Sequence, residues 1–68
     1  MNPMISNVIK SERKAAGLTQ EEFAERSGLG LRFVRELERG KPTCRMDKVE
    51  EALGFFSYHL EPVKDHRE

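Results

Sequence analysis

The 68-residue sequence has a single cysteine, no tryptophan and no long apolar run. Because Cys44 has no second cysteine, an internal disulfide is excluded, and so is a zinc site built from cysteine pairs. No stretch approaches the roughly 18 apolar residues that a membrane-spanning helix requires. The opening decapeptide, MNPMISNVIK, also lacks the uninterrupted apolar core of a secretion signal. We therefore expect an unprocessed, soluble protein of the cytoplasm that holds no metal ion.

Residue combinations that enzymes use are missing as well. The sequence has no Ser/His/Asp set and no glycine loop of the kind that cradles phosphate. The acidic cluster Glu21, Glu22 and Glu25 is more simply the solvated face of a helix, whose N-terminal dipole favours the first two. A chain this short forms one domain and buries only about 60% of its unfolded surface, which leaves no pocket-sized interior. We expect neither an enzyme nor a cofactor.

The net charge is zero overall but not locally. The twelve Lys and Arg balance the twelve Asp and Glu. Residues 1–48 hold ten basic against seven acidic side chains, whereas residues 49–68 hold two against five. The two parts therefore carry opposite biases, and a polyanion would dock on the first part.

Apolar side chains at helical spacing predict an all-α fold of four helices. The first three helices should cover residues 5–16, 19–27 and 31–39, with glycines at positions 17 and 40 ending the first and third. A fourth helix follows, with an apolar stripe formed by Met46, Val49, Leu53 and Phe56. Gly54 lies off this stripe, so we take it as an internal helix residue that lets the helix run to near Ser57. An end at Gly54 is the alternative.

The second helix should begin sharply and end in a tight corner. Thr19 and Glu22 form a capping-box pair, in which each side chain accepts a hydrogen bond from the other residue's amide. Only Gly28, Leu29 and Gly30 separate this helix from the third, which is the length of a helix-turn-helix connection. Such a corner lays one helix across the sugar-phosphate backbone and projects the next into the major groove. A plain helical bundle is the alternative on this pattern alone.

After the helices, residues 58–63 alternate apolar and polar side chains, a pattern typical of a half-buried strand. The chain offers no second strand, so we expect pairing with the same segment of a second copy across a two-fold axis. Residues 1–57 would then be the DNA-binding domain, 58–63 a dimerisation strand and 64–68 a polar tail. The side chains expected at this interface are Phe56, Tyr58 and Leu60.

Two segments, LTQEEFAERSGLG and VRELERGKP, resemble the Cro/phage-repressor type of helix-turn-helix domain, also called the XRE family. The resemblance covers residues 5–56 and implies a domain of four or five helices that binds double-stranded operator DNA as a dimer. It implies base contacts from the third helix by Leu31, Arg32, Arg35 and Glu36. It implies contacts to the DNA backbone by Thr19, Gln20, Arg39 and Lys41.

The resemblance also gives several of these positions a specific role. Arg32 is the expected guanine reader, since a guanidinium can donate twice, to O6 and N7 of that base. Leu31 stands where the phage proteins carry glutamine, so we expect contact with a thymine methyl group there instead. Gln20 matches a glutamine that contacts a phosphate and braces the recognition helix. Arg13 and Glu38 match a largely buried salt bridge between the first helix and the end of the third.

A longer string, GLGLRFVRELERGKPTCRMDKV, together with the trailing strand, is similar to the small HipB-type antitoxins. This resemblance implies a homodimer that joins its terminal strands, represses its own operon and binds a HipA-like kinase toxin. Ser57 stands where the resemblance leads us to expect glycine. A free-standing phage-type or restriction-controller repressor is the alternative within DNA binding. A protein-interaction module that binds no DNA is the alternative outside it.

Phe33 is an unusual aromatic residue among the base-facing positions of the third helix. We expect it to pack against neighbouring residues, with contact to DNA as the alternative. Cys44 has no resolving cysteine and is expected to be an ordinary loop or helix-start residue. His59 and His66 lack metal-ligand spacing and are expected to be solvated.

Overall fold

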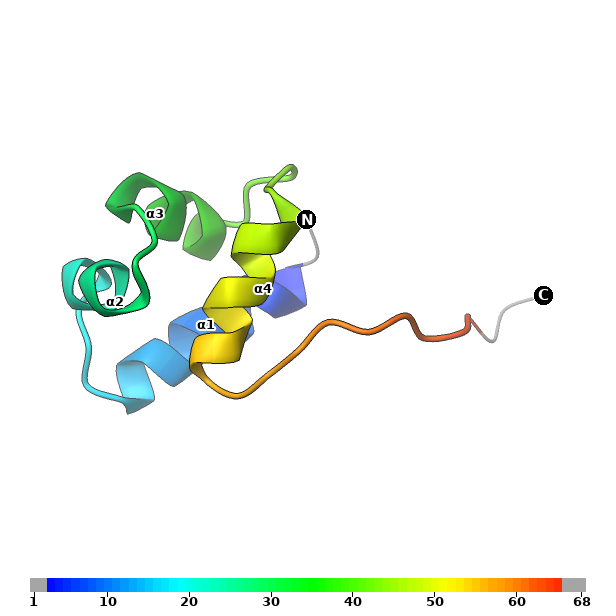
Figure 1. Cartoon of the computed structure of the whole chain (residues 1–68), viewed down its shortest axis with the longest axis horizontal. Helices are drawn as coiled ribbons and strands as arrows, with labels where there is room; N and C mark the ends of the chain where they lie inside the picture. Colours follow the sequence, from blue (N-terminus) through cyan, green and yellow to red (C-terminus); the bar gives the residue numbers. More distant parts are fainter. Residues whose placement is uncertain (1–2, 66–68) are drawn as a thin grey trace.

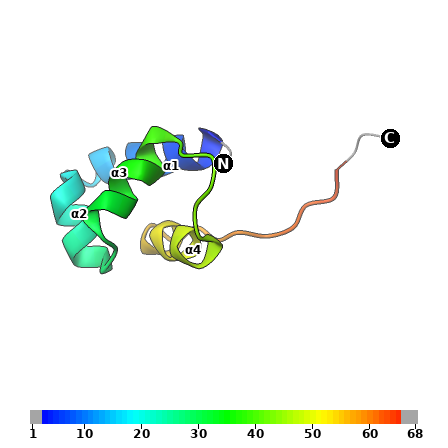
Figure 2. The same ribbon diagram turned by 90° about the horizontal axis from the view of Figure 1, so that it is seen from above.

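The computed structural model describes residues 3–65, and this part of the chain folds into four α-helices with no strand. Their bounds are α1 Pro3–Ala15, α2 Gln20–Ser27, α3 Leu31–Arg39 and α4 Met46–Phe55. α3 packs against α2 and α1, and α2 also contacts α4. Figures 1 and 2 show the helices as one body, from which the residues after α4 leave as an extended segment. The prediction of an all-α fold with four helices is confirmed.

The starts of α1 and α2 follow from local sequence. α1 begins at Pro3, two residues earlier than predicted, because proline suits the first helical position, where its missing N–H is not needed. Before α2, the Thr19 N–H donates to Glu22 Oε1 at 2.8 Å and the Glu22 N–H donates to Thr19 Oγ1 at 3.0 Å. The predicted capping box is therefore confirmed. Its hydrogen bond from the Thr19 backbone is the main cause that lowers the pKa of the Glu22 carboxyl.

The corner between α2 and α3 is as tight as predicted. Gly28 ends α2 in the left-handed region, with φ of 80°, and donates its N–H to the carbonyl of Ala24. Ser27 Oγ bridges the corner by donating to the Phe23 carbonyl at 2.7 Å and accepting from the Leu29 N–H at 3.2 Å. Leu29 is buried in the core, as expected for the residue that plugs the turn. These bonds fix the direction in which α3 leaves α2.

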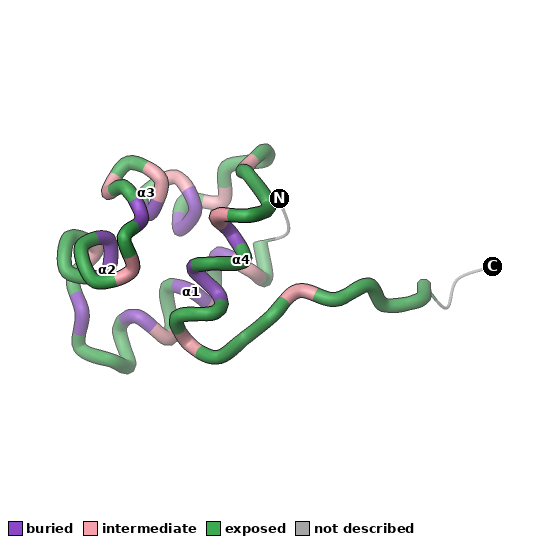
Figure 3. Tube along the Cα trace, viewed as in Figure 1, coloured by how far each residue is buried: buried purple, intermediate pink, exposed green. Residues whose placement is uncertain are grey.

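A small core fills the space between the helices. The largest fully buried side chains are Phe23, Ile9, Leu37 and Val34. α4 contributes Val49, Ala52 and Leu53, and the ring of Phe23 lies 5.1 Å from Phe55 and 5.2 Å from Phe56 between ring centres. Figure 3 shows the buried positions on the inward sides of the helices. Each helix therefore has one face committed to packing and one face open to solvent.

The predicted apolar stripe of α4 is wrong at its first position. Met46 is 74% exposed, although Val49 and Leu53 on the same stripe are buried. The helix begins at Met46, so this side chain lies at the edge of the body, beside a shallow hollow shared with Ile5 and Leu60. Periodicity places a residue on a face but does not say how far along the helix the core extends.

α4 continues through Gly54, which is therefore a helix residue, but it ends at Phe55, short of the predicted end near Ser57 and one residue beyond the alternative end at Gly54. Beyond it, Ser57 has φ of 68°, and it is the only described residue other than glycine with a positive φ. The Ser57 N–H donates to the Gly54 carbonyl and the Tyr58 N–H to the Leu53 carbonyl. This is the paired bonding of a Schellman helix end, where glycine is the usual left-handed residue. Serine therefore occupies a backbone conformation that glycine adopts without strain.

The predicted strand at residues 58–63 is not supported, because the structure assigns no strand there. A strand needs a neighbouring strand to complete its ladder of hydrogen bonds, and one copy of the chain supplies none. Residues 58–65 instead extend away from the body, with Leu60 half-buried and the others exposed (Figure 3). The expected polar tail, 64–68, lies partly outside the described residues. Within residues 3–65, no helix is both long and apolar enough to cross a membrane.

Candidate nucleic-acid interface

α3 has an anchored face and an open face. Val34, Leu37 and Glu38 are buried against the other helices. On the other side, a shallow hollow runs along the helix surface and is lined by Leu31, Arg32, Arg35, Glu36 and Arg39. These positions recur at helical spacing, so one side of a nine-residue helix presents three arginines together. The predicted base-contacting residues therefore lie on one surface.

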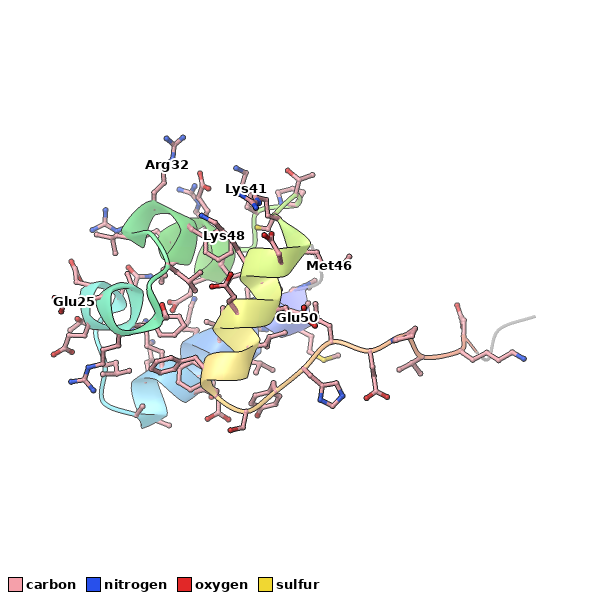
Figure 4. The ribbon with its side chains drawn as sticks, viewed as in Figure 1. Glu25, Arg32, Lys41, Met46, Lys48 and Glu50 are labelled. Atoms are coloured by element: carbon pink, nitrogen blue, oxygen red, sulfur yellow. The ribbon has the colours of Figure 1, made fainter. Side chains whose placement is uncertain are left out.

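The four predicted base-contacting residues differ in how far they reach into solvent. The Arg32 side chain is 89% exposed and projects away from the body in Figure 4. Arg35 is exposed as well, whereas Leu31 is half-buried and packs against the edge of the core. Glu36 is also half-buried, with 20% of its side chain exposed. Arg32 is thus the residue best placed to enter a groove.

Acidic side chains accompany the basic ones on this surface. Arg32 Nε lies 3.5 Å from Glu36 Oε2, and Lys41 Nζ lies 3.3 Å from Glu36 Oε1. The hydrogen bond from Lys41 is the largest cause that lowers the pKa of the Glu36 carboxyl, and Arg32 adds to it. On the other edge, Arg35 Nη2 lies 3.7 Å from Glu21 Oε2 of α2. The exposed cations are therefore partly neutralised before any partner binds.

The predicted backbone-contacting residues lie at two ends of this surface. Thr19 and Gln20 are at the N-terminus of α2, while Arg39 and Lys41 are at the C-terminus of α3. Gly40 turns the chain so that the Lys41 N–H donates to the Glu36 carbonyl at 3.1 Å. The turn brings the Lys41 side chain back beside α3. Of these four residues, Arg39 lines the hollow and the other three lie outside it.

A buried salt bridge fixes α3 from behind. Arg13 of α1 donates from Nε to Glu38 Oε2 at 2.6 Å and from Nη2 to Glu38 Oε1 at 3.0 Å. Arg13 Nη1 also donates to the Leu18 carbonyl at 2.7 Å. Gln20 Nε2 adds a bond of 3.1 Å to Glu38 Oε1. This network joins α1, the start of α2 and the end of α3, so the orientation of α3 is set by three elements.

The bridge is covered on both sides, since 11% of the Arg13 side chain and 2% of the Glu38 side chain are exposed. Its hydrogen bond with Glu38 raises the pKa of Arg13. No buried side-chain nitrogen or oxygen among the described residues lacks a hydrogen-bond partner. A buried bidentate pair of this kind is geometrically demanding, because every polar atom must be satisfied without water.

The loop after α3 and the start of α4 form a second basic hollow that sequence reasoning missed. It is lined by Phe33, Glu36, Lys41, Thr43, Cys44, Arg45 and Lys48. Lys48 Nζ lies 5.8 Å from the centre of the half-buried Phe33 ring, which packs against the core. Arg45 is paired with Asp47 at 2.7 Å. The basic residues at positions 41, 45 and 48 are the feature of the sequence that could have indicated this hollow.

The residues expected at a dimer interface lie at both ends of α4, because Phe56 and Tyr58 follow its end whereas Leu60 lies beside Met46 at its start. Phe56 is half-buried against Phe23 and Phe55. The Tyr58 hydroxyl donates to Glu12 Oε2 of α1 at 2.8 Å, which raises the pKa of Tyr58. Leu60 packs against the core from the extended segment. Contacts within one copy therefore already hold the beginning of this segment against the body.

The other singled-out residues form no site. Cys44 is half-buried, and His59 pairs with Glu61 at 2.6 Å on the surface. The described residues contain no group of three or more potential metal-ligating side chains. His66 lies outside the described residues.

The comparisons with known proteins agree with this geometry. A helix-turn-helix family model, HTH_3, matches residues 9–62. A relative from Sinorhizobium fredii (strain NBRC 101917 / NGR234), called "Uncharacterized HTH-type transcriptional regulator y4mF", is 43% identical over 49 residues. The match covers 72% of this chain and 64% of the relative, so the chain spans just under two thirds of that protein's length. No solved structure matches the chain. The chain belongs to the helix-turn-helix family of DNA-binding domains.

Proposed function

We propose that this helix-turn-helix protein is a sequence-specific transcriptional repressor that binds double-stranded operator DNA as a homodimer in the cytoplasm. The observation that carries the proposal is the open face of α3, where arginines project while the opposite face is fixed by the Arg13–Glu38 bridge. Side chains can read base edges only when their helix is held rigidly and their hydrogen-bond donors are exposed.

The dimensions of α3 fit this role. An α-helix with its side chains is about 10–12 Å across, which fits the major groove, about 12 Å wide. α2 lies across the N-terminal end of α3 through the tight corner at Gly28 (Figure 1). We propose that α2 rests against the sugar-phosphate backbone while α3 enters the groove.

Within the groove, we propose that Arg32 reads guanine and Leu31 contacts a thymine methyl group, with Arg35 further along. Thr19, Gln20, Arg39 and Lys41 are proposed to contact phosphates, which position the protein without reading sequence. Gln20 is already bonded to Glu38, so a phosphate bound there would be linked directly to the brace of α3.

We propose that the extended segment joins two copies. Its backbone is not part of a sheet in one copy, and exposed apolar side chains, Met46, Tyr58 and Val63, lie on or beside it. Pairing of residues 58–63 with the same segment of a second copy would form a two-stranded ribbon. The ribbon would cover part of these apolar side chains, and Phe56 and Leu60 would lie at the interface. Such a dimer would present two α3 helices to successive major grooves, about 34 Å apart.

A narrower proposal is that the protein is the antitoxin of a HipA-like kinase toxin and represses its own operon. The support is the similarity of residues 28–49 to HipB-type antitoxins, together with an extended segment after α4. A free-standing repressor of the phage or restriction-controller type would share all the features of α3. A kinase-like gene beside this one, and rescue of cells from its product by this protein alone, would separate the two.

The proposed function is tested by titrating the purified protein against DNA from upstream of its own gene and following fluorescence anisotropy at two salt concentrations. We expect selective binding over a scrambled duplex and a steep loss of affinity as salt rises, because phosphate contacts release counterions. Equal affinity for both duplexes at both salt concentrations would instead favour a protein-interaction module.

A further inference from the structure

Glu36 lies on the recognition face, yet its carboxylate is already occupied. Oε1 is 3.3 Å from Lys41 Nζ and Oε2 is 3.5 Å from Arg32 Nε. Only 20% of its side chain is exposed, against 89% for Arg32. A cytosine reader would have to offer a carboxylate oxygen to the base amine. Glu36 instead directs one oxygen toward each neighbouring cation.

The atom that Glu36 faces on Arg32 matters for recognition. A guanidinium has five N–H donors in a fixed plane, and a carboxylate at Nε leaves the two terminal nitrogens directed outward. Those two nitrogens are the ones needed for an end-on pair of bonds to O6 and N7 of guanine. In Figure 4 the Arg32 guanidinium lies at the outer end of the side chain, away from the body.

Arg35 and Lys41 do not share this arrangement. Arg35 is drawn toward α2 by Glu21, at 3.7 Å from Nη2, so a terminal nitrogen rather than Nε is engaged. Lys41 reaches Glu36 from the loop after α3 and lies beside the groove-facing surface. Glu36 thus sits between the two hollows and contacts one cation in each.

We propose that Glu36 is a positioning residue that sets base specificity through Arg32 and holds Lys41 at the flanking phosphate, and that it does not itself read a base. This inference rests on the proposed function. It assigns the guanine preference to a pair of residues, one that contacts the base and one that aims it.

The test is a selection from a random-sequence duplex library, which yields the relative affinity for each base at each position. The variants are Glu36→Gln, Arg32→Ala and the double variant, with Glu21→Gln as the matched control. Glu21→Gln also removes one negative charge, from a residue of α2 that pairs with Arg35 of α3. Thermal unfolding of each variant checks that the fold is retained.

We expect Arg32→Ala to lose a guanine preference at one position and Glu36→Gln to lower that same preference by roughly three- to tenfold, part of the value of a bidentate contact. Glu36→Gln should have no further effect at that position when Arg32 is already alanine. Glu21→Gln should leave the preference at that position unchanged. Both charge-removing variants should bind random DNA at least as well as the wild type, because an acidic group near phosphates is gone.

Three outcomes would overturn the inference. Loss of preference at a position that Arg32→Ala leaves intact would make Glu36 a base reader. A profile for Glu36→Gln that matches Glu21→Gln would remove any positioning role. In the free protein, the NMR signal of the Arg32 Nε–H should move as Glu36 titrates. It should not move in Glu36→Gln. A signal that stays fixed in the wild type would also reject the positioning role. By contrast, a wild-type protein that selects no sequence would reject the proposed function, whatever the NMR titration shows.

Discussion

The two faces of α3 carry the same kind of ion pair in opposite surroundings. On the inner face, Arg13 and Glu38 bond through two nitrogens and two oxygens while almost fully covered. On the outer face, Arg32 meets Glu36 at 3.5 Å and remains open to water. A charge left alone on the inner face would have no solvent, whereas water screens the outer pair and leaves its arginine free to exchange partners. Arginine and glutamate are therefore structural on one side of this helix and suited to recognition on the other.

Removing the carboxylate of Glu38 from the inner face should have the largest effect. Glu38→Ala leaves the Arg13 charge buried without a partner and strips Gln20 of an acceptor. We expect the free energy of unfolding to fall by about 3–5 kcal/mol, which a domain this small can hardly sustain. Urea unfolding followed by circular dichroism measures the loss.

Glu21→Ala serves as the control for this substitution, because Glu21 is an exposed acidic residue paired with Arg35. We expect it to change stability by less than about 0.5 kcal/mol. If the two variants unfolded at the same urea concentration, the inner pair would be no more structural than an exposed one.

The next effect in size concerns the outer face. Arg32→Ala should leave the urea midpoint unchanged and weaken binding to the operator by about 1–3 kcal/mol, with relaxed preference at one base pair. Arg26→Ala, which removes an exposed arginine of α2, is the charge-matched control. Anisotropy titrations with operator and scrambled duplex separate the two effects. Equal losses of affinity on both duplexes would identify Arg32 as a phosphate contact and would contradict its role as a base reader.

The smallest expected effect is an acid dependence of the contacts that Glu36 makes with Lys41, the main cause of its lowered pKa, and with Arg32. The pKa of Glu36 is lowered in the folded protein, so its contribution to stability is complete above the unfolded value of about 4.5 and is lost as pH falls through the folded value. The difference in urea midpoint between wild type and Glu36→Gln should therefore shrink as the pH is lowered from about 7 to about 3. Glu22 and Asp47, whose pKa values are also lowered, keep an acid dependence in both proteins. A pH-independent difference would mean that the Glu36 charge plays no part.

Local signals in the sequence were sufficient for the helices and the corner. The Thr19 and Glu22 pair located the start of α2, and the glycines at 28 and 40 located two helix ends, because each depends on only a few neighbouring residues. Exposure of Met46 could not be predicted in the same way, since it depends on how far the rest of the body extends. The strand proposal at 58–63 depends on a second copy, which a single chain does not provide.

The surface of α3 was predicted as a set of residues but not as a set of contacts. The positions of the arginines follow from helical spacing. The pairing of Glu36 with Lys41 does not, because it needs the left-handed turn at Gly40 to bring Lys41 back beside α3. The contact between Arg35 and Glu21 depends on the angle between α2 and α3. Sequence patterns therefore gave the chemical groups, and the turns determined which groups meet.

The serine at the end of α4 has a consequence for the direction of the extended segment. Holding a residue other than glycine in the left-handed region costs about 1–2 kcal/mol, and at Ser57 two backbone hydrogen bonds offset that cost. Rotation at Ser57 would relieve the strain, but it would break those bonds and would also pull Tyr58 away from Glu12 and Leu60 away from the core. The left-handed turn at Ser57, together with the contacts of Tyr58 and Leu60, therefore sets the direction in which the segment leaves α4.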